Sequence, residues 1–66
     1  MKGEIYKIII HDENIGWTMR SLLVLEIYKT IRYRNDGLAA RCLVLETGKH
    51  HEIYVDILEN NGRKVA

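Results

Sequence analysis

The three histidines are the first side chains in this 66-residue sequence whose chemistry suggests a metal site. His50 and His51 are adjacent, and neighbouring residues of a strand point to opposite faces, so the two cannot bind one metal ion together. A site would need one of them to meet His11 and a carboxylate from Asp12 or Glu52. Nothing in their spacing requires that meeting, so we expect solvated histidines, with no metal and no cofactor.

The single cysteine, Cys42, is the only candidate for a nucleophilic thiol. Covalent catalysis would require a nearby base and a pocket for the oxyanion. The residues around it supply neither: Ala39, Ala40, Leu43 and Val44. The five glycines are isolated and form no phosphate-binding loop. The sequence therefore predicts a small, half-buried strand cysteine and a protein that is not an enzyme.

Four basic residues gather around a predicted hairpin tip, interleaved with Tyr28 and Tyr33: Lys29, Arg32, Arg34 and Arg41. Cations that pair with phosphates, beside aromatic rings that stack on bases, are typical of nucleic-acid-binding barrels. Acidic residues dilute this cluster: Glu26, Asp36 and Glu46. Long hairpins also carry arginine simply as a solvated face. Nucleic-acid binding is therefore the alternative function rather than the first.

The only tryptophan, Trp17, follows a predicted loop together with Met19. If exposed, they would form an apolar patch with Ile15 and Tyr54, and tryptophan is favoured at binding hot spots. A small barrel also needs large side chains to plug its open ends, and that is the position we favour for Trp17. The candidate contacts for a protein partner are Trp17, Met19, Tyr28 and Tyr54.

The hairpin that must position most of these side chains covers residues 22–47. Apolar residues recur at every second position before the turn signal Asn35-Asp36-Gly37: Leu23, Leu25, Ile27, Ile31 and Tyr33. This spacing predicts two long strands joined at that turn. A helix over residues 18–34 is the alternative, because the segment contains good helix formers. Its β-branched residues and tyrosines, and the alternation itself, favour the strand.

A three-residue loop, with Gly37 in the left-handed conformation, fixes the expected pairing of these strands. The expected partners are Arg34 with Leu38, Ile31 with Arg41, Lys29 with Leu43, and Ile27 with Leu45. The shared apolar face would then consist of Leu23, Leu25, Ile27, Leu43 and Leu45. A two-residue Asp36-Gly37 loop is the alternative, and it separates apolar from polar side chains less well.

The rest of the chain predicts shorter elements around this hairpin. Three further strands are expected: residues 3–11, 50–55 and 63–65. Loops or turns separate them: residues 12–16, 47–49 and 60–62. Residues 54–59 predict a single helical turn before the last strand. Residues 1–66 should therefore form one domain with five strands and one short 3-10 turn.

The composition fits a small globular domain, with 47% hydrophobic and 29% charged residues and a net charge of +1. This balance excludes nucleic-acid binding by bulk attraction, so such a function would need a local patch. One cysteine forms no internal disulfide, so stability must come from aliphatic packing or a partner subunit. No apolar run approaches the roughly 18 residues that span a membrane, and Glu4 argues against a secretion signal. We therefore expect a cytoplasmic protein.

A single helical turn before the last of five strands is the plan of a small SH3-like barrel. Within that class the chain resembles small uncharacterised proteins of tailed bacteriophages, especially marine ones. Four segments carry the resemblance: Lys2-Gly3-Glu4-Ile5-Tyr6, Gly16 with Leu22-Leu23-Val24-Leu25-Glu26-Ile27, Arg41-Cys42-Leu43-Val44-Leu45-Glu46, and Glu52-Ile53-Tyr54-Val55-Asp56-Ile57-Leu58-Glu59. The resemblance implies an all-β, five-stranded SH3-like barrel of viral origin. Its motifs are structural and imply no activity.

These expectations lead to one primary function and two alternatives. The first is a non-catalytic protein-interaction module that binds a host or viral protein in the host-cell cytoplasm, away from membranes. The second is nucleic-acid binding, with the four basic hairpin residues on phosphates and Tyr28 or Tyr33 stacking on bases. The third is a homo-oligomeric structural part, which would follow if the hairpin edge pairs with its copy.

Overall fold

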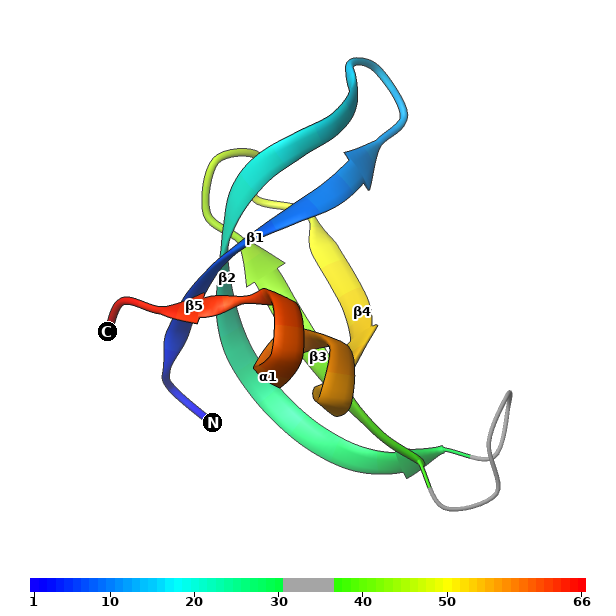
Figure 1. Ribbon diagram of the computed structural model, residues 1–66, viewed down its shortest axis with the longest axis vertical. Helices are drawn as coiled ribbons and strands as arrows, with labels where there is room; N and C mark the ends of the chain where they lie inside the picture. The colour runs from blue at the N-terminus through cyan, green and yellow to red at the C-terminus, as the bar shows by residue number, and fades with distance from the viewer. Residues whose placement is uncertain (31–36) are drawn as a thin grey trace.

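The protein is mostly β-structure, arranged as one antiparallel sheet with one short helix (Figure 1). The computed structural model describes residues 1–30 and 37–66. Its elements in chain order are β1 (Ile5–Asp12), β2 (Gly16–Thr30), β3 (Gly37–Val44), β4 (His50–Tyr54), α1 (Val55–Asn61) and β5 (Arg63–Lys64). Strands make up 63% of the structure, which confirms the mostly-β prediction. The alternative helix over residues 18–34 is wrong, because β2 occupies most of that segment.

The sheet is open rather than closed into a barrel. Its strand order is β4-β3-β2-β1-β5, with antiparallel pairing throughout the described residues. β2 is the long central strand and bends along its length, so that its first half carries the β1–β2 hairpin away from the rest of the sheet (Figure 1). The edge strands β4 and β5 are not neighbours in the sheet. The five expected strands are therefore present, without the closure that the barrel prediction required.

The pairing of β2 with β3 differs from both registers expected from the turn. The observed partners are Thr30 with Gly37, Lys29 with Leu38, Tyr28 with Ala39, and Ile27 with Ala40. The predicted partners of Ile27 and Lys29, Leu45 and Leu43, are therefore wrong. The reason is that Gly37 is a paired strand residue and not the last residue of a tight loop. The predicted pairs of Ile31 and Arg34 lie outside the described residues.

The core lies on the opposite side of this hairpin from the expected one. Leu22 and Val24 of β2 are 0% and 1% exposed. None of the residues expected on the apolar face is buried: Leu23, Leu25, Ile27, Leu43 and Leu45. Residues 22–25 are all aliphatic, so a period of two fits either face and cannot choose between them. A bulge between Val24 and Glu26 then shifts the ladder, which a strict alternation does not anticipate.

The buried cluster is formed by alternate residues of the first three strands and one residue of the helix: Tyr6, Ile8, Ile10, Leu22, Val24, Ala40, Cys42, Val44 and Leu58. Leu58 is the helical member and is completely buried. α1 contacts β1, β3 and β4, and its Leu58 joins the core cluster, against which the half-buried Val55 also packs. The core is small, so each of its members carries a large share of the stability.

The helical element occurs where it was expected, but it is a seven-residue α-helix and not a 3-10 turn. It ends at Asn61, and the backbone N–H of the next residue, Gly62, donates to the carbonyl of Leu58 at 2.9 Å. A Cβ atom at position 62 would lie 2.6 Å from that oxygen, so this tight exit into β5 requires glycine. Neither described segment contains a helix with the length and hydropathy needed to cross a membrane.

Glu4 holds the ends of the chain against β1. Its Oε2 lies 2.8 Å from Lys64 Nζ, and its Oε1 lies 2.8 Å from the amino group of Met1. The Tyr6 hydroxyl donates a hydrogen bond to the same Oε1 at 2.8 Å. The hydrogen bond from Lys64, followed by those from the amino terminus and Tyr6, lowers the pKa of Glu4 from 4.5 to about 2. Glu4 is therefore ionised across the physiological pH range.

Candidate functional site

An exposed apolar face covers the β1–β2 hairpin. Ile9 lies opposite Met19, and His11 lies opposite Trp17. Residues that face each other across an antiparallel pair share one side of the sheet, so these side chains are contiguous. The exposed fractions are 57% for Ile9, 74% for Trp17 and 52% for Met19. The expectation that Trp17 plugs a barrel end is therefore wrong, because the sheet leaves it in solvent.

The turn of the hairpin positions this face. The Asp12 carboxylate accepts a hydrogen bond from the backbone N–H of Asn14 at 2.8 Å, which starts the turn and lowers the pKa of Asp12. Gly16 then takes a positive φ of 81°, a conformation that favours glycine, and begins β2. The His11 ring meets the Trp17 ring edge to face, with centroids 5.4 Å apart. The indole is thus held in place without being buried.

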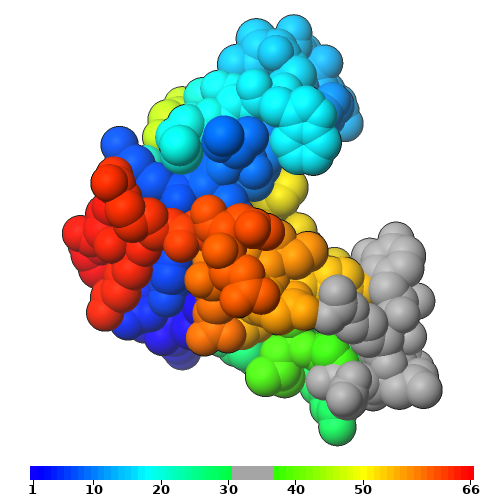
Figure 2. All heavy atoms as spheres, viewed as in Figure 1, coloured from blue at the N-terminus to red at the C-terminus, as the bar shows by residue number. Residues whose placement is uncertain are grey.

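This face forms one wall of a groove of about 900 Å³. Ile53 of β4 and Ile57 of α1 line it as well, and Figure 2 shows the hollow between the β1–β2 hairpin, in blue and cyan, and the orange helical region. The volume is at the upper end of the range of about 300–1,000 Å³ that ligand sites occupy. The groove is therefore large enough to receive several side chains of a partner.

The ionisable side chains among the described residues of the groove are all basic types. Lys7, His11, His51 and Arg63 contribute to it, and none of its described lining residues is acidic. Lys7 and Arg63 are exposed and lie opposite each other in the β1–β5 pair. Burial lowers the pKa of His51, which favours its neutral form. The groove therefore suits a ligand that combines apolar groups with negative charge.

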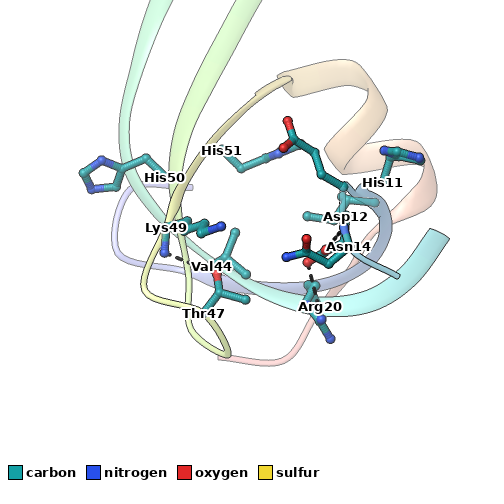
Figure 3. A pocket seen from close by; sticks show the side chains of 11 residues that line it. His11, Asp12, Asn14, Arg20, Val44, Thr47, Lys49, His50 and His51 are labelled. Atoms are coloured by element: carbon teal, nitrogen blue, oxygen red, sulfur yellow. Dashed lines mark hydrogen bonds and ion pairs between the residues drawn. The ribbon is translucent and has the colours of Figure 1, made fainter. Parts of the chain in front are cut away.

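A smaller pocket of about 210 Å³ shares Ile10, His11 and His51 with the groove and lies at the end of β1 (Figure 3). One Arg20 Nη lies 3.6 Å from the Asp12 carboxylate, and the buried Arg20 Nε has no hydrogen-bond partner within the two described segments. On the opposite wall, the Lys49 backbone N–H donates to Thr47 Oγ1 at 3.2 Å. Acidic and basic side chains alternate around this pocket, so it shows no preference for either charge.

The adjacent histidines point in opposite directions, as expected for a strand (Figure 3). His50 is exposed, whereas His51 is half-buried between the two pockets. Within residues 1–30 and 37–66, no three histidine, cysteine or carboxylate side chains come close enough together to hold a metal ion.

Cys42 lines neither pocket and is completely buried in β3, more deeply than the half-buried position expected. Burial raises the pKa of its thiol from 9.0 to about 11, so the thiol is protonated at neutral pH. A protonated, enclosed thiol is a poor nucleophile. Cys42 acts as a small core residue.

The four expected protein contacts fall in two separate places. Trp17 and Met19 line the groove. Tyr28 and Tyr54 instead lie opposite Ala39 from its two neighbouring strands, β2 and β4. Both tyrosines are half-buried, and Ala39 between them is only 1% exposed. The tyrosine pair therefore lies beside the first residues of β3 and is not part of the groove.

The expected nucleic-acid contacts do not form one basic patch in the described chain. Arg41 Nε lies 3.1 Å from the Glu26 carboxylate, and Glu52 lies opposite Arg41 on β4. Two carboxylates thus offset this arginine, while Lys29 is exposed further along β2. Three residues proposed for this function lie outside the described residues: Arg32, Tyr33 and Arg34.

Several groove residues were not predicted from the sequence: Lys7, Ile9, Ile57 and Arg63. A signal existed for Ile9, because residues 8–10 are all isoleucine and alternation must place one of them opposite the other two. No comparable signal existed for Ile57 or Arg63, since their position depends on how α1 and β5 return to β1.

Comparisons with models of known protein families, with curated proteins and with solved structures found no match.

Proposed function

We propose that this chain is a non-catalytic protein-interaction module and that the groove beside Trp17 binds its partner. The observation that carries this proposal is the 74% exposure of Trp17, next to the exposed Ile9 and Met19. Contiguous apolar surface that borders a groove marks interaction sites, because leaving it in water has no structural benefit. Tryptophan in such a position is the residue type that most often dominates binding.

The energies involved require the whole groove and not Trp17 alone. Covering roughly 150 Å² of the indole at about 25 cal/mol per Å² gains roughly 4 kcal/mol. Association costs at least as much in lost translational and rotational freedom. Ile9, Met19 and the opposite wall of the groove must therefore contribute for binding to be useful.

The architecture we propose is an SH3-like one whose barrel is incompletely closed. Support comes from the position of β5 beside β1, from the helix between β4 and β5, and from the strand β2 shared by both halves of the sheet (Figure 1). The resemblance of residues 2–6 and 52–59 to small phage proteins supports a viral origin. The partner would then be a host or viral protein in the cytoplasm of the host cell.

Capture of a partner from lysate of a bacterial host, with wild-type and Trp17→Ala protein, tests this function. Trp17→Ala removes the main anchor of the groove but no core contact, so we expect affinity to fall about 30-fold, or about 2 kcal/mol. Leu45→Ala is the matched control, because Leu45 is 46% exposed and does not line the groove. The control should bind as the wild type does.

Equal binding by Trp17→Ala and wild type would contradict the proposal. Nuclease treatment separates it from the nucleic-acid alternative, which predicts loss of the captured material. That alternative also predicts binding that falls steeply with salt and weakens in Lys29→Ala and Arg41→Ala. It has less support, because Glu26 already pairs with Arg41.

A further inference from the structure

The free edge of β1 runs along the groove. β5 pairs with β1 only at Tyr6 and Lys7. From residue 8 to residue 12, β2 is the only strand among the described residues that pairs with β1. This open stretch is about 17 Å long at 3.4 Å per residue, which matches about five residues of an extended peptide.

Backbone hydrogen bonds identify which groups this edge presents. The Val24 N–H donates to the Glu4 carbonyl at 2.9 Å, so Glu4 faces β2. The Ile5 carbonyl accepts from the Val65 N–H at 2.8 Å, so Ile5 faces the other way. Bonding directions alternate along an antiparallel strand, so odd-numbered residues of β1 face away from β2. Beyond β5, the N–H and C=O groups of Ile9 and His11 therefore point out of the sheet edge.

We propose that the groove binds an extended peptide that adds a strand to this edge of β1 and carries acidic residues among its apolar ones. The inference rests on the proposed function and specifies its partner. Main-chain hydrogen bonds to Ile9 and His11 would fix the peptide in register, as in other cases of strand addition. Alternate side chains of the peptide would then enter the groove between Trp17 and the wall formed by Ile53 and Ile57.

The basic residues of the groove favour an acidic peptide as its ligand. Lys7 and Arg63 lie at the point where the added strand would meet β5. Neither is a partner in the ion pairs formed among the described residues. His11 adds a further basic group along the edge. Because none of the groove's described lining residues is a carboxylate, an acidic peptide gains attraction and a basic one is repelled.

A second copy of this chain fits the edge less well. Antiparallel pairing of two β1 strands about Ile9 would place Lys7 of each copy opposite His11 of the other. Two basic residues opposite each other bring no charge attraction to the strand pair, unlike an acidic partner. Lysine on an edge strand is also a common device against such self-pairing. The charge pattern thus favours a different chain over a copy of this one.

Selection from a randomised library of nine-residue peptides provides the probe. We expect the selected peptides to carry aspartate or glutamate with apolar residues at alternate positions. A double variant, Lys7→Glu with Arg63→Glu, should bind them at least tenfold more weakly and select basic peptides instead. Lys29→Glu is the matched control, because it changes the same charge at an exposed site outside the groove.

Amide hydrogen exchange in the complex reports the strand addition itself. Bound peptide should slow exchange at Ile9 and His11 at least tenfold, while Ile8 and Ile10, which already face β2, should change little. Ile9→Pro removes one edge donor without breaking the β1–β2 ladder and should bind more weakly than Ile9→Ala. If Ile9→Pro does not fold, amide exchange in the wild-type complex still tests whether the peptide adds a strand.

Four outcomes overturn the inference. Selected peptides that bind without slowing amide exchange at Ile9 and His11 would contradict strand addition. If Trp17→Ala still lost binding in that case, the proposed function would remain supported. Selection of basic or proline-rich peptides would contradict the stated partner chemistry. Protection of Ile9 and His11 that rises with protein concentration alone would assign the edge to a second copy. Failure to select any peptide, together with unchanged partner capture by Trp17→Ala, would remove the proposed function as well.

Discussion

At the scale of single residues, Trp17 is the side chain on which binding depends, and its surroundings order it before a partner arrives. The His11 ring contacts it at a centroid distance of 5.4 Å, while 74% of the residue stays in solvent. An anchor that is already ordered loses less conformational freedom on binding. The geometry therefore explains how an exposed tryptophan can support specific binding rather than non-specific hydrophobic association.

Glu4 makes a separate prediction, which concerns stability at low pH. Its folded pKa of about 2 lies below the ordinary 4.5, so the folded state favours the ionised carboxylate. This contribution is fully present above about pH 4.5 and is lost as the pH falls through about 2. Glu4→Gln should therefore be less stable at pH 7 and should show a flatter loss of stability between these two pH values. Urea unfolding midpoints measured across this range check the prediction.

Glu13→Gln is the control for this experiment, because Glu13 is exposed in the β1–β2 turn, far along the chain from β5. It should keep the acid-dependent slope of the wild type. A Glu4→Gln variant with the wild-type slope would show that the contacts with Lys64 and the amino terminus do not stabilise the fold.

Side chains were predictable where residue type alone decided their role. Adjacent histidines on a strand must diverge, and His50 and His51 do so. A lone cysteine among apolar neighbours was expected to be half-buried and unreactive, and Cys42 is buried completely. Trp17 was not predictable in this way, because its exposure depends on whether the sheet closes. Apolar character is equally compatible with a plug and with a binding surface.

At the scale of elements, one side of α1 packs in the core and another side lines the groove. Leu58 is completely buried against the sheet, whereas its neighbour Ile57 is 37% exposed and lines the groove. The helix was predictable in position, because turn residues and the last short strand bracket it. The register of β2 against β3 was not, because residues 22–25 are aliphatic on both faces and Gly37 pairs as a strand residue.

Substitutions at these two neighbours should separate stability from binding. Leu58→Ala leaves a cavity and should cost about 2–5 kcal/mol, a large part of the roughly 3–10 kcal/mol expected for a domain of this size. Ile57→Ala should change stability much less but weaken binding to the groove. Urea unfolding and a binding titration on the same two proteins check both expectations.

Equal stability of the two variants would contradict the assignment of Leu58 as the side chain that connects α1 to the sheet. Unchanged binding by Ile57→Ala would contradict the contribution of α1 to binding in the groove.

At the scale of the whole molecule, the open sheet is what creates the binding surface. β4 and β5 do not pair, so the groove forms between the β1–β2 hairpin and the region of β4 and α1 (Figure 2). The number of strands was predictable from turn signals and alternation within short windows. Closure was not, because it depends on contacts between elements far apart in the chain, for which local patterns carry no information. The viral origin and cytoplasmic location stay predictions.

Quenching of tryptophan fluorescence by acrylamide in the free protein tests the central claim most directly, because Trp17 is the only tryptophan. The open groove predicts emission close to that of tryptophan in water, with ready quenching at every protein concentration. Bound partner or selected peptide should shift the emission to the blue and protect it. A blue-shifted, protected emission in the free, dilute protein would show that Trp17 is packed inside the fold, and would contradict the binding groove.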